Sequence, residues 1–208
     1  MEITTIGLDL AKNVFQVHAV DAAGDVVVQK TLRRAQLLPF FTKAGPCLVG
    51  IEACGTSHHW ARELTALGHE VRLMPPAYVK PYVKRGKNDA VDAEAICEAV
   101  SRPNMRFVPI KHVEQQAILA VHRARQGLVK ARTAQANQIR GLLSEFGIVI
   151  PQGIHSIAKR VPDILEDAEN GLPGTMRHLL RRLNDHLKEL GRQAEELELQ
   201  IKLWHKEN

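Results

Sequence analysis

Aromatic residues are scarce in this chain of 208 residues, where Phe, Trp and Tyr together make up only 4%. The hydrophobic fraction of 45% is ordinary for a globular protein, so we expect a core of Leu, Ile, Val and Ala. Cysteines are few as well. Cys47, Cys54 and Cys97 are odd in number and lack the spacing of a zinc site, which argues against a disulfide framework and a zinc-binding fold. Reduced thiols and a cytoplasmic location are expected.

Long apolar runs are also missing from the sequence. No stretch approaches the roughly 18 residues of a membrane-spanning helix, so no membrane association is expected. The N-terminus lacks a basic segment followed by an apolar one, so we expect no signal peptide. The net charge of +5 gives modest support for a nucleic-acid partner. Residues 99–144 hold eight Lys and Arg against one acid, whereas residues 163–208 hold ten acids against seven bases, so the positive charge belongs to the middle of the chain.

The first half of the chain alternates between strand and helix patterns. Apolar and alternating runs predict five strands: residues 3–9, 14–20, one that begins with 26–28, 47–52 and 71–74. The loops between the first three are too short for parallel pairing. A helix pattern precedes each of the last two, so these should run parallel to the first strand. This is the order of the RNase H-like fold, an α/β domain with a mixed five-stranded sheet and flanking helices.

Four carboxylates stand at the ends of these elements. Asp9 ends the first strand and Glu52 the fourth, where burial of a charge is costly unless something positive is bound. Asp89 and Asp92 are three residues apart at the start of a predicted helix, so they share one face, about 5–6 Å apart at Cβ. If the helix packs across the strand ends, all four converge. Their mutual repulsion then favours a hard divalent cation, Mg²⁺ or Mn²⁺.

Each acid has a structural explanation of similar weight when it is taken alone. Asp9 would cap the turn after its strand, and Glu52 would pair with Lys12. Asp89 and Asp92 would be acids that the helix dipole favours in a first turn. The coincidence of all four in the places that the fold expects favours the metal site.

Basic residues mark two candidate contacts with nucleic acid. Lys84, Arg85 and Lys87 follow two tyrosines just before the acidic helix, and a solvated basic linker explains them equally well. A second group lies on the long helical stretch that follows, where one-signed charge over several turns favours nucleic acid over a solvated face. Its members are Arg123, Arg125, Lys130, Arg132 and Arg140.

The second half of the chain is predicted to be helical. Small residues recur at three- and four-residue steps over 117–141, which predicts a face for close helix packing. From Met176 to Trp204 apolar residues keep heptad spacing over four heptads, which predicts a coiled coil with a helix of the same chain or of another copy. We therefore expect two domains, residues 1–112 and 113–208. The heptads still run at Asn208, so a longer protein is expected.

Three blocks of the sequence resemble a known family. Gly7–Lys12, Gly50–Gly55 and Asn88–Ile96 resemble the N-terminal region of the DEDD transposases of the bacterial insertion sequence 110 family. The resemblance implies a RuvC-like RNase H-fold domain followed by a coiled-coil region. It also implies that Asp9, Glu52, Asp89 and Asp92 are the DEDD carboxylates that bind Mg²⁺ or Mn²⁺.

The same resemblance implies a recombinase of the nucleoid that cuts and transfers DNA strands as a dimer or tetramer, guided by an RNA. In that family a second domain supplies a serine nucleophile, and this sequence ends before such a domain would begin. Two alternatives remain. One is a stand-alone nuclease of the Holliday-junction-resolvase type, and the other is a non-catalytic module that binds nucleic acid and oligomerises.

Overall fold

A computed structural model describes residues 2–83 and 89–207 of the chain. The chain divides into two compact units, Met1–Lys111 and His112–Asn208. Within the described residues, none of the helices has the length and apolar character required to cross a membrane.

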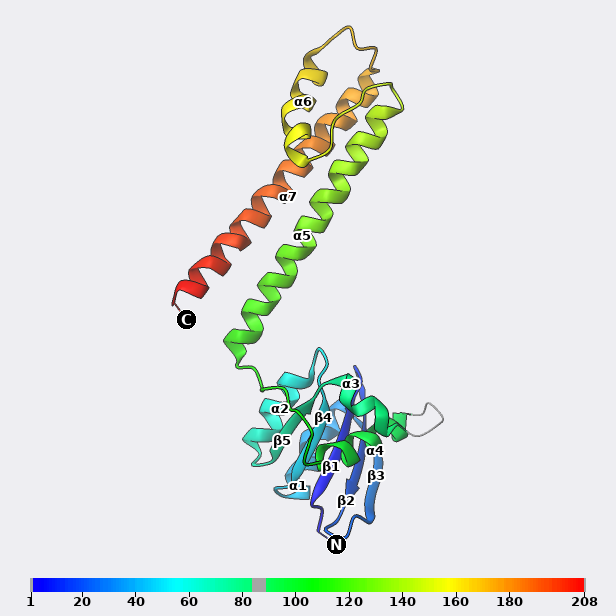
Figure 1. Ribbon diagram of the computed structural model, residues 1–208, viewed down its shortest axis with the longest axis vertical. Coiled ribbons are helices and arrows are strands. Elements are labelled where there is room, and N and C mark those ends of the chain that lie inside the picture. Colours follow the sequence, from blue (N-terminus) through cyan, green and yellow to red (C-terminus); the bar gives the residue numbers. More distant parts are fainter. Residues whose placement is uncertain (1, 84–88, 208) are drawn as a thin grey trace. The chain divides into compact units, whose positions relative to one another are not determined.

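The first unit is built on one five-stranded sheet with the order β3-β2-β1-β4-β5 (Figure 1). Its strands are β1 (Thr5–Leu10), β2 (Val14–Val20), β3 (Val26–Arg33), β4 (Leu48–Glu52) and β5 (Glu70–Met74). The first three form an antiparallel meander, because two short turns join them. β4 runs parallel to both β1 and β5, and each of these connections carries a helix. The predicted RNase H-like fold is confirmed.

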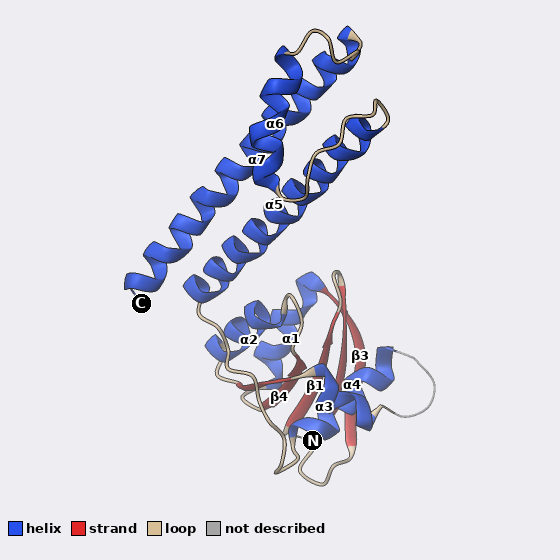
Figure 2. Ribbon diagram, turned by 45° about the horizontal axis from the view of Figure 1, so that its top comes forward, coloured by secondary structure: helices blue, strands red, loops and turns tan. Residues whose placement is uncertain are grey.

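Helices cover both faces of this sheet (Figure 2). On one face lie α1 (Leu37–Ala44), preceded by the turn η1 (Arg34–Gln36), and α2 (Ser57–Ala66). Their apolar side chains form a single buried core with those of the strands. Ile6 and Leu8 of β1 belong to this core. Because side chains alternate along a strand, Gly7 between them lies on the opposite face of the sheet.

The opposite face is covered by α4 (Asp89–Val100), which packs on β1, β2 and β4. Between β5 and α4 the chain forms the short helix α3 (Pro76–Val79) and the turn η2 (Lys80–Tyr82). Met74, Val79 and the inner side of α4 make a second, smaller core. β5 is further bridged by Val108, whose backbone pairs with Leu73 as the chain leaves the sheet.

The second unit is a helical hairpin of α5 (Val113–Ser144) and α7 (Gly174–Glu207), with α6 (Ile154–Glu166) between them in sequence. The two long helices run antiparallel, since the early residue Arg125 pairs with the late residue Glu198. Six of the nine predicted heptad positions of α7 are buried, and the other three are half-buried. The predicted seam is therefore a packing face, and its partner within this chain is α5.

The face of α5 that packs against α7 differs from the predicted one. The small residues expected to form it are all exposed, and a Cβ atom added to Gly127 or Gly141 would meet no neighbouring atom within 4 Å. The buried residues of α5 are instead Ile118, Ala136, Ile139 and Leu143, three of which are large aliphatic residues. The physical reason is area, because large aliphatic side chains remove more apolar surface from water than Ala or Gly.

Candidate functional site

Asp9 and Glu52 lie beside each other on neighbouring parallel strands. The register pairs Leu8 with Ile51, so the next residue on each strand reaches the same edge of the sheet. Both acids alternate with the core residues and therefore point to the face that α4 covers. The sequence folds this way because a buried apolar run ends at each acid.

Two glycines allow α4 to lie directly on the sheet. A Cβ atom on Gly7 would stand 2.1 Å from the carbonyl oxygen of Ala93 and 2.4 Å from the amide nitrogen of Cys97. A Cβ atom on Gly50 would stand 2.7 Å from the Cβ of Val100. Any larger residue would push the helix away. The sequence contained this signal, because each glycine interrupts an apolar strand two residues before a carboxylate.

The close approach of α4 brings a third acid to the pair. Asp92 immediately precedes Ala93, the residue that touches Gly7. Burial raises the pKa of Glu52 above its ordinary value, and the negative charges of Asp9 and Asp92 raise the pKa further. The structure thus brings Asp9, Glu52 and Asp92 within electrostatic reach of one another.

The fourth predicted acid, Asp89, begins α4, but its side chain lies outside the described residues. Among the side chains that are described, no three of the types His, Cys, Asp and Glu converge closely enough to hold a metal ion. The chemistry of the donor set nevertheless fits a hard cation. Carboxylate oxygens are the preferred ligands of Mg²⁺ and Mn²⁺, and crowded, partly desolvated carboxylates gain most from a positive partner.

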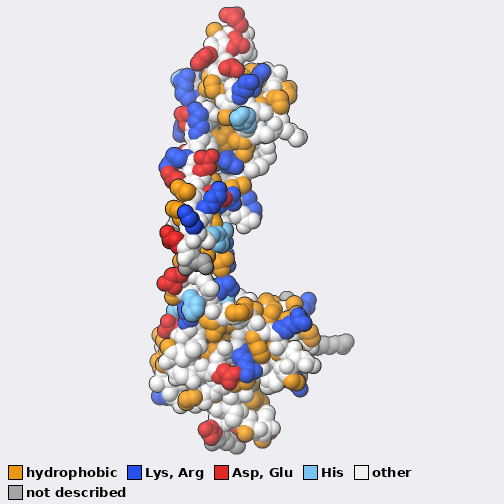
Figure 3. Space-filling model, turned by 60° about the vertical axis from the view of Figure 1, so that its left-hand side comes forward, with side chains coloured by type: hydrophobic (Ala, Val, Ile, Leu, Met, Phe, Trp, Pro, Cys, Tyr) orange, Lys and Arg blue, Asp and Glu red, His pale blue; other side chains and the backbone are white. Residues whose placement is uncertain are grey.

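The predicted basic contacts fall into distinct environments. Lys84, Arg85 and Lys87 lie outside the described residues. On α5 the side chains of Arg123 and Lys130 are exposed. Acidic and basic side chains lie next to one another on the face of the helical unit drawn in Figure 3.

Three further arginines of α5 are engaged within the helical unit. Arg125 forms an ion pair with Glu198 of α7, and the side chain of Arg132 lies 3.8 Å from a Cβ position on Gly191. The Arg140 guanidinium donates hydrogen bonds to the carbonyl oxygens of Pro151 (3.1 Å) and Gly153 (2.6 Å). Arg125 and Arg140 thus hold the hairpin and its loop together, whereas the buried Nε of Arg132 has no hydrogen-bond partner among the described residues.

Comparison with known proteins agrees with this geometry. The profile of a family described as "Transposase", the DEDD transposases of insertion sequence 110, matches residues 6–148, which include all four acids. The chain belongs to this family.

Relatives in several bacteria extend the match over nearly the whole chain. A probable family 20 transposase of Pseudomonas aeruginosa is 52% identical over 202 residues, covering 97% of this chain and 60% of the relative. A transposase for the insertion sequence element IS1328 of Yersinia enterocolitica is 44% identical over 200 residues, covering 96% of this chain and 59% of the relative. This DEDD transposase chain therefore spans about three fifths of the length of these relatives.

Proposed function

We propose that this chain carries the metal-binding carboxylates with which a transposase cuts and transfers DNA strands. Asp9, Glu52, Asp89 and Asp92 would hold Mg²⁺ or Mn²⁺. The observation that carries the proposal is the placement of Asp9 and Glu52 on one face of the sheet, with Asp92 brought to them by α4, the helix seated on Gly7.

The acids differ in how the fold holds them in place. Asp9 and Glu52 are fixed by neighbouring strands, so the distance between their backbones is set by the sheet. Asp92 reaches them from a separate element, which makes its distance depend on how α4 is seated. When bound, a divalent cation at such carboxylates lowers the pKa of an attacking hydroxyl and stabilises the leaving oxygen of a phosphodiester. The acids of the chain orient that cation and the scissile phosphate.

Nucleic-acid contacts are proposed at the exposed basic residues. Arg123 and Lys130 of α5 are open to solvent and would contact phosphates, as would Lys84, Arg85 and Lys87 from the segment before α4. Arg125 and Arg140 would support the hairpin that presents them. The partners proposed for these surfaces are DNA and a guide RNA.

Self-association into a dimer or tetramer is also proposed. The apolar seam of α7 is occupied by α5 of the same chain, so an oligomer would need other residues. Leu199 and Leu203, one turn apart on α7, are more than half exposed and would be available for that contact.

Calorimetric titration tests the metal site most directly. Mg²⁺ and Mn²⁺ would be added to the full chain with and without duplex DNA, and the same titrations repeated with Asp9→Asn. Glu63→Gln is a matched control, because it removes a partly exposed acid of α2 that lies outside the cluster. We expect the wild type and the control to bind metal, most tightly with DNA present, and Asp9→Asn to lose this binding.

Equal binding by Asp9→Asn and the wild type would contradict the proposal, and so would no binding by any form. Cleavage of a branched DNA by this chain alone would instead favour the resolvase-type nuclease.

A further inference from the structure

A second site lies on the first unit, away from the carboxylates. It is a cleft of about 480 Å³ between the α3–η2 segment and the turn that follows α4. Seven residues line it: Tyr78, Pro81, Tyr82, Arg102, Asn104, Met105 and Arg106. Its volume falls within the range of about 300–1,000 Å³ that is usual for small-ligand sites.

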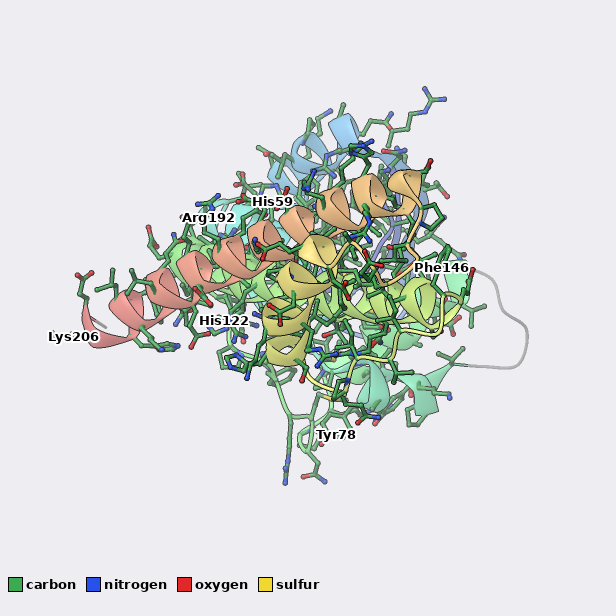
Figure 4. All side chains as sticks on the ribbon, turned by 90° about the horizontal axis from the view of Figure 1, so that it is seen from above. His59, Tyr78, His122, Phe146, Arg192 and Lys206 are labelled. Atoms are coloured by element: carbon green, nitrogen blue, oxygen red, sulfur yellow. The ribbon has the colours of Figure 1, made fainter. Side chains whose placement is uncertain are left out.

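Both tyrosines of the chain lie in this cleft. Tyr82 packs in part against the small core under α4, so its ring has a structural role as well. Tyr78 is 43% exposed and belongs to none of the buried clusters formed by the described residues. It lies on α3 and is labelled in Figure 4. An exposed ring at the wall of a cleft is a surface on which a planar group stacks.

Positive charge accompanies these rings. The guanidinium carbon of Arg102 lies 6.0 Å from the centre of the Tyr82 ring, and the Nη2 atom of Arg102 pairs with Oε1 of Glu98 at 2.5 Å. Arg106 is exposed and has no carboxylate partner among the residues that the structure describes. Asn104 adds an amide that both donates and accepts hydrogen bonds. The cleft therefore offers stacking, positive charge and edge recognition together.

These three properties match one chemical class, a nucleobase joined to a phosphate. Single strands bind where bases stack on aromatic rings and basic side chains follow the backbone. A base inside a duplex has both faces covered by its neighbours, so it cannot enter such a cleft unless it is unpaired.

The position of the cleft would let a bound nucleic-acid strand continue toward the carboxylates. The segment carrying the tyrosines starts just after Met74, which is paired with Glu52 in the sheet. The arginine turn follows the end of α4, and the eight steps from Asp92 to Val100 span about 12 Å at 1.5 Å per residue. The cleft and the acids thus share α4 as a common support.

We infer that the cleft between Tyr78, Tyr82 and Arg106 binds an unpaired nucleotide of the nucleic acid on which the carboxylates act. The inference rests on the proposed function for the class of its ligand. Tyr78 supplies the stacking surface, Arg106 contacts the phosphate, and Asn104 faces the edge of the base.

Fluorescence anisotropy with labelled oligo(dT), oligo(rU) and duplex DNA tests this inference, in EDTA so that the metal site does not contribute. Tyr78→Ala should weaken binding of unpaired strands by about tenfold, the loss typical of one stacked base. Tyr78→Phe should bind like the wild type, since it keeps the ring. If Tyr78→Ala weakens the binding of oligo(dT) alone, the nucleotide comes from DNA. If it weakens the binding of oligo(rU) alone, the nucleotide comes from RNA, and if it weakens both, the cleft accepts either.

The salt dependence of nucleic-acid binding distinguishes a contact with phosphate from stacking on a base. Arg106→Ala should reduce the slope of log K against log salt by about 0.7, the value for one phosphate of a single strand, whereas Tyr78→Ala should leave the slope unchanged. Lys43→Ala removes the same charge from an exposed position on α1 and is the matched control. Unchanged affinity in Tyr78→Ala, or an equal loss for duplex DNA, would overturn the inference.

A metal titration of Tyr78→Ala separates this inference from the proposed function. If the variant binds metal and unpaired strands as the wild type does, the cleft inference fails and the metal site stands. If the wild type binds no metal but shows the Tyr78-dependent strand binding, the cleft stands and the proposed chemistry fails.

Discussion

Gly7 of β1 lies against the carbonyl oxygen of Ala93 of α4, with no room for a methyl group between them. This contact sets the distance between the helix and the sheet. Because Asp92 is the neighbour of Ala93, and Asp9 follows Gly7 by two residues on the same face, the contact also sets how near the acids come. A glycine that is not itself a candidate ligand thereby controls the geometry of the candidate metal centre.

Gly7→Ala is expected to destabilise the first unit by about 3 kcal/mol or more, because overpacking against backbone atoms leaves little room to relax. Thermal unfolding followed by Trp60 fluorescence, in a Trp204→Phe background, would report on this unit alone. Gly55→Ala is the control, since a Cβ there meets no atom within 4 Å and the backbone needs no positive φ. Equal melting temperatures for the two variants would contradict the close contact.

Glu52→Gln is expected to stabilise the metal-free protein. The folded state raises the pKa of Glu52, so its charged form is less favourable in the folded chain than in the unfolded chain at neutral pH. Removing that charge should therefore raise the melting temperature of the metal-free protein. The same variant should lose the stabilisation that Mg²⁺ gives the wild type. A variant less stable than the metal-free wild type would show that the carboxylate is a structural partner instead.

Lowering the pH is expected to destabilise the first unit, because His69 binds a proton more readily in the unfolded chain than in the folded one. This side chain is only 4% exposed, its Nδ1 accepts from the amide of Cys47 at 3.3 Å, and its other nitrogen lies 3.2 Å from the carbonyl oxygen of Phe41. These bonds suit the neutral ring, and burial lowers the pKa of His69, although the contact with Phe41 opposes this in part. The unfolded chain therefore binds a proton first as the pH falls.

Stability should consequently be full above about pH 6.5 and fall below it, by at most about 1.4 kcal/mol per pH unit, until the folded pKa is reached. Urea unfolding between pH 8 and pH 5 measures this slope, with His69→Gln as the comparison. Burial and the nearby charges of Lys111 and Arg62 also lower the pKa of His58, so part of the slope should persist in the variant. Identical slopes in the two proteins would exclude His69 as a source.

Asn184→Leu is expected to stabilise the helical unit by about 1–2 kcal/mol. Asn184 is 4% exposed in α7, and its side-chain oxygen finds no hydrogen-bond partner among the described residues. Replacing an unsatisfied buried amide by an aliphatic group removes a desolvation cost. Hydrogen exchange of α5 and α7 would measure the change, with the exposed substitution Asp185→Leu as a control. Faster exchange in Asn184→Leu would indicate that the amide has a partner in solution.

The prediction of the sheet succeeded because its strands are local patterns. Buried apolar runs and short turns specify β1 to β5 and their pairing, and an acid at the end of a run marks Asp9 and Glu52. The packing of α5 was predicted on the wrong face. A stripe of small residues and a stripe of aliphatic residues both have helical periodicity, and the sequence of one helix does not state which of them its partner will cover.

The sequence alone determined the order of the strands and the long helices, since alternation, turns and heptads act over a few neighbouring positions. It also placed two acids at the ends of adjacent parallel strands, because that follows from topology. Only the tertiary structure decided that α4 touches the backbone at Gly7, that Arg125 and Arg140 form bonds within the helical unit, and that Tyr78 and Arg106 share a cleft. These relationships join residues distant in sequence, and they depend on the close packing of whole elements, where a single methyl group changes the outcome.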